Sequence, residues 1–299
     1  MKTILIIGSE GFIGKHLLCH FENKNFRVIK LDLIEKNEIN YYKLNLNAPN
    51  YKEIFQKYDF DFCINASGVA NVQLSFENPI KDFSSNVMNV YEILNCIKLF
   101  QPKCKFLNLS SAAVYGNPLK NPISEDSLIN PTSPYGYHKY YSELICNEFY
   151  NLFNIGTISI RIFSAFGSGQ KKLLFWDLYN KIKLSKEKIF LFGTGNESRD
   201  FIHVFDIINA VDLILNNSPF NGDVYNVASG IEITIKKAVN LFLEIMNFKG
   251  DVIYTEDIKK GDPINWVANI EKLKKIGFIN TYNLEDGLKE YKKWLKENE

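Results

Sequence analysis

The chain has 299 residues, 46% of them hydrophobic, which is enough to bury a large core in one large domain or two smaller ones. Its 35 basic and 34 acidic residues are mixed along the whole chain and give a formal net charge of +1. This balance excludes a general attraction to nucleic acid or to an anionic membrane, so any anionic ligand must be held by local geometry.

Short apolar, β-branched runs alternate with longer amphipathic stretches through the first 165 residues. This alternation is typical of a parallel sheet wrapped by helices, and nearly continuous apolar strands are expected when both sheet faces are covered. The fold class is therefore α/β, with a Rossmann-type, doubly wound parallel sheet. The predicted strands are 3–8, 26–32, 61–67, 105–111 and 157–163, and the predicted helices lie near 12–24, 50–58, 79–100 and 133–153.

The pattern is less regular after Phe163. A glycine-rich turn at 164–170 is followed by predicted helices near 173–185, 204–216, 234–247, 270–276 and 284–297, and by strands at 189–193, 224–229 and 251–254. We expect residues 1–165 to form the Rossmann domain and residues 166–299 to form mainly a smaller α/β substrate-binding lobe. Segments near 200–222 are expected to pack back on the first domain.

The first predicted strand leads into G-S-E-G-F-I-G, which places Gly8, Gly11 and Gly14 directly before a helix. Glycines suit such a loop because the turn is tight, the backbone approaches a pyrophosphate, and the helix packs closely on the strand. An ordinary strand-to-helix turn would also explain a glycine triplet. Asp32 ends the second predicted strand, where a carboxylate can bind both hydroxyls of an adenosine ribose. Because this acid repels a 2′-phosphate, we predict NAD rather than NADP.

The segment 133–143, SPYGYHKYYSE, contains four tyrosines, and only Tyr135 has a lysine four positions later, Lys139. Residues four apart lie on one helix face, and a phenol that transfers protons near neutral pH needs a nearby cation. A unit charge at about 5.5 Å lowers its pKa from about 10 to about 8. An accidental pair on a solvated helix is the alternative. Ser133 and Pro134 are predicted as helix cap and first-turn proline.

The predicted strand 105–111 ends in Ser110 and Ser111. A hydroxyl at the carboxyl end of a parallel strand faces the crevice in which open α/β sheets bind ligands. Adjacent strand residues point to opposite faces, so we expect one of the two serines to face this crevice. A capping role is the alternative.

These segments together resemble the extended short-chain dehydrogenase/reductases, in particular the nucleotide-sugar epimerase/dehydratase group typified by UDP-galactose 4-epimerase. The resemblance implies an NAD-binding Rossmann domain, a nucleotide-diphosphate sugar substrate and a homodimer. The matching segments follow the family's order over nearly the whole chain: GSEGFIG, SSAAVYG, SPYGYHK, RIFSAFGSGQ, GTGNESRDFIHV, VYNVASG and KKGDPINWVANIEKLKKIGF.

By this resemblance, Tyr135 is the base that takes a proton from a sugar hydroxyl, and Lys139 holds the nicotinamide ribose. Ser111 matches the catalytic serine or threonine. Arg199 matches the arginine that binds the substrate diphosphate, a role that suits a bidentate guanidinium. The other expected cofactor contacts are Gly8, Gly11, Phe12, Ile13, Gly14, Asp32, Asn45, Leu46, Asn65, Ala66 and Ser67.

Departures from the family patterns bear on the reaction. The 4,6-dehydratases of this group carry an Asp-Glu pair directly after the catalytic threonine, because eliminating water needs a further acid and base. Ala112 and Ala113 occupy these positions and cannot move a proton, so dehydration is disfavoured. The 3,5-epimerases and GDP-fucose synthases use a cysteine near this strand, and decarboxylating relatives use a glutamate there. This chain has alanine instead.

The reaction type that these departures leave is oxidation and reduction at a single carbon of the sugar. We favour an NAD-dependent nucleotide-sugar 4-epimerase that works through a transient 4-keto sugar, in cell-surface polysaccharide or sugar-nucleotide metabolism. The alternative is a nucleotide-sugar 4-ketoreductase or dehydrogenase with net redox, but Asp32 favours a recycled NAD. A catalytically idle dinucleotide-binding regulator is disfavoured because Ser111, Tyr135 and Lys139 are all present.

Four positions differ from the common family pattern and leave the sugar open. Ser164 replaces an asparagine frequent in 4-epimerases, and Lys259 is the nearest match to an arginine. Asn45 stands where an aspartate contacts adenine, and Trp266 lies close to the position that limits sugar size, which argues against an N-acetyl group. Ser164, Lys259 and Trp266 complete an expected substrate-binding set with Ser111, Tyr135 and Arg199.

Metal-binding and targeting signals are weak. His16 and His20 stand four apart with Cys19 between them, but no second ligand pair accompanies them, so we predict no metal. Residues 1–7 are too short for a signal peptide, and no run approaches the roughly 20 apolar residues of a membrane span. The five cysteines show no C-x-x-C spacing. We therefore expect free thiols and a cytoplasmic protein.

Overall fold

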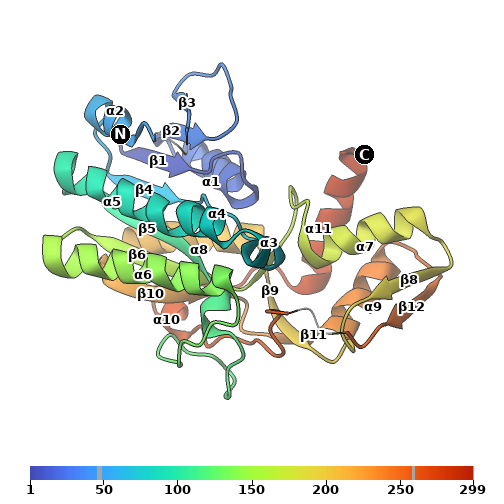
Figure 1. Cartoon of the computed structure of the whole chain (residues 1–299). Coiled ribbons are helices and arrows are strands. Elements are labelled where there is room, and N and C mark those ends of the chain that lie inside the picture. Colours follow the sequence, from blue (N-terminus) through green and yellow to red (C-terminus); the bar gives the residue numbers. More distant parts are fainter. Residues whose placement is uncertain (46–48, 258–259, 299) are drawn as a thin grey trace.

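The computed structural model describes residues 1–45, 49–257 and 260–298, and it has a parallel sheet at its centre (Figure 1). The strand order of this sheet is β10-β6-β5-β4-β1-β2-β3. From β1 the chain first adds strands on one side of the sheet, and from β4 it adds them on the other side, as in doubly wound folds. This order confirms the predicted α/β class. The strands are β1 (Thr3–Ile7), β2 (Arg27–Asp32), β3 (Tyr41–Lys43), β4 (Phe62–Asn65), β5 (Lys105–Ser111), β6 (Thr157–Ile162) and β10 (Asn221–Val227).

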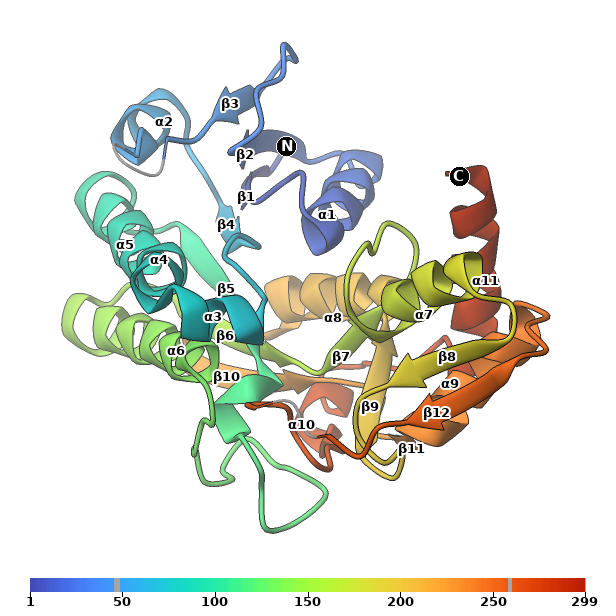
Figure 2. The same cartoon turned by 45° about the vertical axis from the view of Figure 1, so that its right-hand side comes forward.

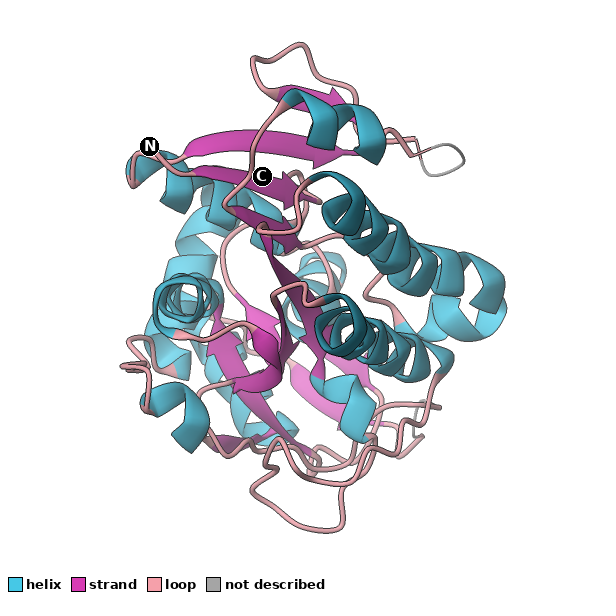
Figure 3. Cartoon of the chain, turned by 90° about the vertical axis from the view of Figure 1, so that its left-hand side faces the viewer, coloured by secondary structure: helices cyan, strands magenta, loops and turns pink. Residues whose placement is uncertain are grey.

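Helices cover both faces of the main sheet (Figure 3). One face carries α1 (Phe12–Asn23), α8 (Val204–Asn217) and α10 (Glu271–Lys274), and the other carries α2 (Tyr51–Lys57), α5 (Asn89–Phe100) and α6 (Pro134–Phe153). Successive residues of β1 enter opposite cores: Ile4 packs with Leu17 of α1, whereas Leu5 packs with Ile93 of α5. Burial on both faces explains why β1 is apolar throughout.

A smaller lobe, at the right of Figure 1, combines helices α7 (Leu173–Leu184), α9 (Ile235–Ile245) and α11 (Leu284–Glu297) with a two-stranded parallel sheet. That sheet pairs β8 (Lys188–Leu191) with β12 (Asp251–Tyr254). Its core includes Phe175, Phe242 and Tyr291. Between the lobes lies a three-stranded sheet of β7 (Ser164–Phe166), β9 (Ser198–His203) and β11 (Glu232–Thr234) (Figure 2).

The chain returns from the smaller lobe to the main sheet. α8 packs on α1, and β10 pairs in parallel with β6 at one edge of the sheet. The main layered body therefore includes Val204–Asn217 and Asn221–Val227, while a division into domains at residue 165 stays a prediction.

The predicted helix 79–100 is divided in the structure. It consists of α4 (Pro79–Phe83), a π-helical segment η1 (Ser84–Met88) and α5, and it follows an additional short helix, α3 (Val72–Glu77). A short 3-10 helix, η2 (Ala112–Tyr115), follows β5. Within the described ranges, no helix has the length and apolar character that crossing a membrane requires.

Candidate active site

The carboxyl ends of β1 and β4 meet at the reversal point of the main sheet, the usual ligand-binding position in open α/β folds. Gly8 follows β1 with a φ of +83°, and a Cβ there would lie 2.7 Å from both Ala66 O and Ser67 N. Only glycine fits this close approach and this backbone conformation. The structure thus brings Gly8, Ala66 and Ser67, three of the expected cofactor contacts, to one place.

The amino end of α1 is open to an anion. α1 follows Gly11, has no side-chain cap and carries no acid in its first turn, so its first N–H groups, beginning with Phe12 and Ile13, are available. A Cβ on Gly14 would lie 1.9 Å from Gly8 O, which shows that glycine permits the helix to pack on the loop. Within the described ranges, the buried Ser9 hydroxyl has no hydrogen-bond partner. These features fit a dinucleotide pyrophosphate.

Asp32 is held at the end of β2 by backbone N–H groups. Its carboxylate accepts from Glu10 N at 2.8 Å and from Leu33 N at 2.7 Å. Beside it lies a second carboxylate that the sequence reasoning missed, that of Glu10, whose side chain is only 5% exposed and pairs with Lys36 at 2.8 Å. The sequence signal that could have identified Glu10 was an acidic residue inside the glycine loop.

The amino end of α6 has the predicted cap. Ser133 Oγ accepts from Gly136 N at 3.1 Å, and Pro134 occupies the first turn. The turn that follows places Tyr135 and Lys139 on one buried face of the helix, with Lys139 Nζ 5.9 Å from the Tyr135 ring centroid.

Ser111 completes a cluster with Tyr135 and Lys139. Its side chain hydrogen-bonds Tyr135 and accepts from Ala113 N at 3.2 Å. Lys139 Nζ donates to Leu109 O at 3.0 Å, on the same strand as Ser111. The neighbouring Ser110 instead donates to Glu143 at 2.5 Å. Of the two serines, Ser111 is therefore the one beside Tyr135.

Burial dominates the electrostatics of this cluster. It raises the pKa of Tyr135 to about 12, against an opposing contribution from the Ser111 hydrogen bond. It also lowers the pKa of Lys139 to about 8, because desolvation disfavours the ammonium ion. The sequence-based expectation of about 8 for the phenol is therefore wrong for the protein alone, since it omitted the desolvation of both groups.

Asn65 faces the protein interior. Its Nδ2 donates to Asn108 Oδ1 at 3.1 Å, Asn108 donates to Ser142 at 3.0 Å, and Ser142 donates to Lys139 O at 2.7 Å. Ser67 donates to Asn65 Oδ1 at 2.5 Å. This chain of hydrogen bonds links the cofactor crevice to α6, while a direct contact of Asn65 with the cofactor stays a prediction.

Two expected substrate residues lie on neighbouring strands. Ser164 begins β7, which pairs in parallel with β9, and Arg199 lies on β9. Arg199 Nη1 donates to the carbonyls of Ser198 and Ile264 at 2.8 and 3.2 Å, which fixes the guanidinium near the segment that leads to Trp266. Their contacts with a substrate stay predictions.

Trp266 belongs to the hydrophobic core. It is 8% exposed, its ring packs edge-on against Phe163, and its indole N–H donates to Gly116 O at 2.8 Å. Because so little of the ring is exposed, only a small part of it can contact a sugar and limit the size of the sugar pocket. Asn45 is exposed, and Leu46 and Lys259 lie outside the described residues.

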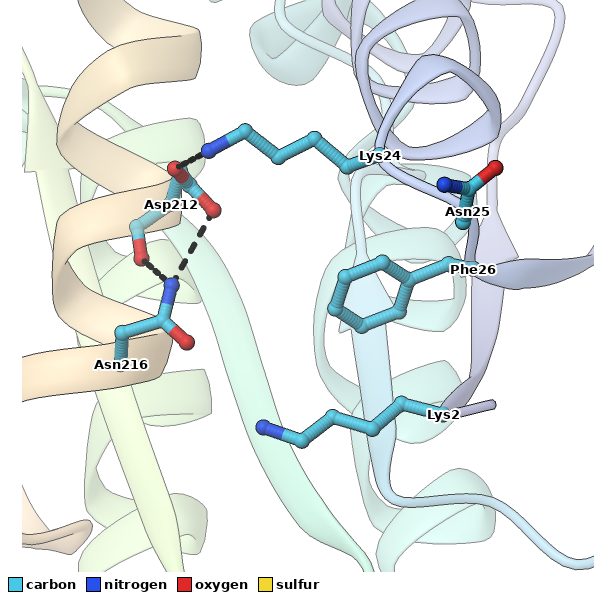
Figure 4. Close-up of a pocket in the computed structure, with 6 residues that line it drawn as sticks. All are labelled: Lys2, Lys24, Asn25, Phe26, Asp212 and Asn216. Atoms are coloured by element: carbon cyan, nitrogen blue, oxygen red, sulfur yellow. Dashed lines mark hydrogen bonds and ion pairs between the residues drawn. The ribbon is translucent and has the colours of Figure 1, made fainter.

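A separate hollow lies between α1 and α8 (Figure 4). Lys24 and Asp212 pair across it at 2.5 Å, and Lys2 also lines it. His20 also approaches Asp212, at 3.6 Å, whereas His16 contacts Ser168 O at 2.8 Å. In the described part of the chain, no three His, Cys, Asp or Glu side chains gather in a possible metal site. None of the expected site residues lines this hollow.

The chain is similar over nearly its whole length to known sugar-nucleotide enzymes. The chain is 28% identical to a UDP-glucose 4-epimerase of Mycoplasma genitalium, over 95% of this chain and 93% of that protein. It is 26% identical to a dTDP-D-glucose 4,6-dehydratase of Dictyostelium discoideum, over 100% of this chain and 82% of that protein.

A solved structure has the same fold. The UDP-glucuronic acid 4-epimerase of Bacillus cereus, in complex with UDP-glucuronic acid and NAD, superposes with a TM-score of 0.90 at 23% identity, over 99% of this chain and 100% of that one. The family model described as NAD dependent epimerase/dehydratase family matches residues 4–228, which is most of the chain. The chain therefore belongs to the NAD dependent epimerase/dehydratase family, is an enzyme, and has NAD as its cofactor.

Proposed function

We propose that this protein is a nucleotide-sugar 4-epimerase that acts on a nucleotide-diphosphate hexose and retains its NAD. The observation that carries the proposal is the cluster of Ser111, Tyr135 and Lys139 at the cofactor crevice, with Ala112 and Ala113 directly after the serine. This set can transfer one proton to and from a sugar hydroxyl. It offers no additional acid and base for elimination.

The proposed catalytic cycle uses few protein groups. NAD held at the glycine loop of Gly8, Gly11 and Gly14 would supply reversible hydride transfer at C4 of the sugar. Tyr135 takes the proton of the 4-hydroxyl and later gives it back to the 4-keto sugar. Ser111 orients that oxygen by hydrogen bonding, and the Lys139 ammonium binds the nicotinamide ribose and stabilises the phenolate. The positive charge of the oxidised ring would also lower the high pKa of the buried phenol.

UDP-hexoses are the proposed substrate class. Two of the similar proteins are a UDP-glucose 4-epimerase and a 4-epimerase bound to UDP-glucuronic acid. Arg199, fixed by two backbone carbonyls on β9, is the proposed diphosphate ligand.

Two other activities compete with this proposal. A 4-ketoreductase or dehydrogenase would use the same three residues but exchange its cofactor with solution. Dehydration has support from the similar dTDP-D-glucose 4,6-dehydratase. It is disfavoured because Ala112 is buried and neither Ala112 nor Ala113 can transfer a proton.

The test has two steps. Purified protein is denatured and the released nucleotide identified, and native protein is then incubated with UDP-glucose, UDP-galactose or UDP-glucuronate and the products resolved by NMR. Stoichiometric NAD and a C4 epimer are expected. An empty cofactor site together with stoichiometric oxidation or reduction of added NAD(P)(H) would replace the proposal with the net-redox alternative, and a 4-keto-6-deoxy product would replace it with dehydration.

We also propose a cytoplasmic homodimer in cell-surface polysaccharide or sugar-nucleotide metabolism. All five cysteines are free thiols, which suits a reducing compartment. Exposed apolar side chains gather on η1, α5 and α6, the helices that we propose pair two subunits: Met88, Tyr91, Tyr137, Tyr141 and Leu144.

A further inference from the structure

A buried aspartate–histidine pair lies directly beside the tyrosine and lysine of the site. Asp82 of α4 is inserted against α6, and its side chain is only 2% exposed. Its Oδ2 lies 2.6 Å from Nδ1 of His138, which is itself 11% exposed. His138 precedes Lys139 and follows Tyr135 by three positions, so the pair contacts the same turn of α6 that carries both groups.

The second oxygen of Asp82 is also buried. Among the residues that the structure describes, Asp82 Oδ1 has no hydrogen-bond partner. Asn86 donates to the Asp82 backbone carbonyl at 3.2 Å. A Cβ on Gly68 would lie 2.4 Å from Asn86 Oδ1 and 3.4 Å from Lys139 Nζ, so these polar atoms meet at the Gly68 backbone. A carboxylate in such low-dielectric surroundings acts strongly on nearby ionisable groups.

The other groups that face Lys139 carry little net charge. Glu143 on α6 is paired with Arg161 of β6 at 2.7 Å, which compensates its charge. Burial raises the pKa of the Cys146 thiol to about 12, so this group is neutral near pH 7. Ser110 and Ser111 present only hydroxyls. Asp82, whose described contacts include His138 but no lysine or arginine, is therefore the group that distinguishes this environment.

We propose that Asp82, held in place by His138, is a positioning residue that sets the pH range in which Tyr135 accepts a proton while Lys139 stays cationic. This inference rests on the proposed function, because it assumes that these two groups limit the reaction. It assigns a role to a pair that is not among the expected substrate or cofactor contacts.

The direction of the effect follows from the sign of the charge. A carboxylate stabilises the protonated forms of its neighbours, and Asp82 accordingly raises the pKa of both Tyr135 and Lys139. It thereby keeps the buried lysine cationic although burial acts in the opposite direction. The same charge holds the proton on the phenol, so both limbs of the pH profile lie at higher pH than they would without it.

The test is the pH dependence of kcat/KM for the holoenzyme with its sugar nucleotide. Asp82→Asn keeps the shape of the side chain and removes its charge. We expect both limbs of the profile, which report the titrations of Tyr135 and Lys139, to move to lower pH by about one unit. Asp212→Asn is the matched control, because Asp212 also contacts a histidine, His20, but lies away from the site. Its profile should coincide with that of the wild type.

A purely structural role for Asp82 would lower the rate or the melting temperature and leave both limbs in place, and that result would overturn the inference. Asp82→Ser, a smaller neutral variant, should give the same shift, so the result can be checked in whichever variant folds. A wild-type protein that epimerises no sugar nucleotide would instead overturn the proposed function. An active wild type whose limbs are unaffected by both substitutions would overturn only the role of Asp82.

Discussion

Among the tyrosines of α6, Tyr135 is the one for which the structure supports a chemical role. Tyr135→Phe removes the proton acceptor, and we expect turnover to fall by at least about 100-fold, the usual contribution of general acid–base catalysis. NAD should remain bound, because the cofactor crevice is built by other residues. Tyr137→Phe is the control, since Tyr137 is 44% exposed on the outer face of the same helix. Turnover within tenfold of the wild type in Tyr135→Phe would exclude this residue as the base.

Lys139 should cost the protein stability below about pH 8. Its pKa is lowered from 10.5 to about 8 by burial, so between these values the unfolded chain binds more protons than the folded one. The contribution of Lys139 to the free energy of unfolding should therefore rise as the pH increases from about 8 to about 10.5, by roughly 3 kcal/mol in total.

Lys139→Met isolates this effect from all other titrations. We expect this variant to be inactive but more stable than the wild type below pH 8, with the difference shrinking towards pH 10.5. Urea denaturation at a series of pH values measures it. A difference in stability that does not vary with pH would show that burying the ammonium carries no such penalty.

The pairing of two side chains can be predicted from the sequence only when they are close along the chain. Tyr135 and Lys139 could be paired because one helical turn joins them. Asp82 and His138 are 56 positions apart, and only the packing of α4 on α6 brings them together. The pKa of Tyr135 could not be predicted either, because it depends on burial that no local pattern specifies.

At the scale of elements, two glycines between β1 and α1 have different functions. Gly14→Ala would place a Cβ 1.9 Å from Gly8 O, and we expect the free energy of unfolding to fall by about 3 kcal/mol through overpacking. At Gly11 the corresponding distance is 3.2 Å and the backbone is extended, so Gly11→Ala should fold normally.

The two variants control for each other. Because Gly11 lies at the amino end of α1, its substitution should reduce the amount of co-purified NAD while the melting temperature of the NAD-free protein changes little. Thermal melts of the stripped proteins and nucleotide quantification separate the two effects. If Gly11→Ala retained full NAD occupancy, the amino end of α1 would not be the pyrophosphate site.

Elements with strong periodicity were predicted well, and short polar ones were not. Apolar runs identified β1, β2, β4, β5 and β6, because helices on both faces require such runs. The three-residue strands β3, β7 and β11 have no comparable pattern. The π-helical segment at Ser84–Met88 was predicted as regular α-helix, since both conformations bury similar side chains.

At the scale of the whole molecule, the chain crosses between lobes more than once. β9 lies between the lobes, α8 and β10 return to the main sheet, and β12 and α11 complete the smaller lobe. Residues of the proposed sugar site, such as Ser164 and Arg199, therefore come from strands that leave or re-enter the main body. Local patterns could not predict this arrangement, because it depends on β7 pairing with β9, strands separated by more than 30 residues.

The proposed homodimer should depend on the outer face of α6. Tyr137, Tyr141 and Leu144 are spaced as i, i+4 and i+7, so they form one exposed stripe on this helix. A charged residue in the centre of an apolar subunit interface is strongly unfavourable because it is buried without a partner. We therefore expect the double variant Tyr141→Glu, Leu144→Glu to elute as a monomer at micromolar concentration, while the wild type elutes as a dimer. Light scattering coupled to size-exclusion chromatography measures both masses.

The matched control for this experiment is Leu184→Glu, at the end of α7 in the smaller lobe. Leu184 is 88% exposed, more than either residue of the stripe, so exposure of an apolar side chain alone would predict at least as large an effect there. The dimer should nevertheless persist in this variant, because α7 lies in the smaller lobe, away from α6 (Figure 1). A wild type that is monomeric, or a double variant that remains dimeric, would show that α6 does not form the interface.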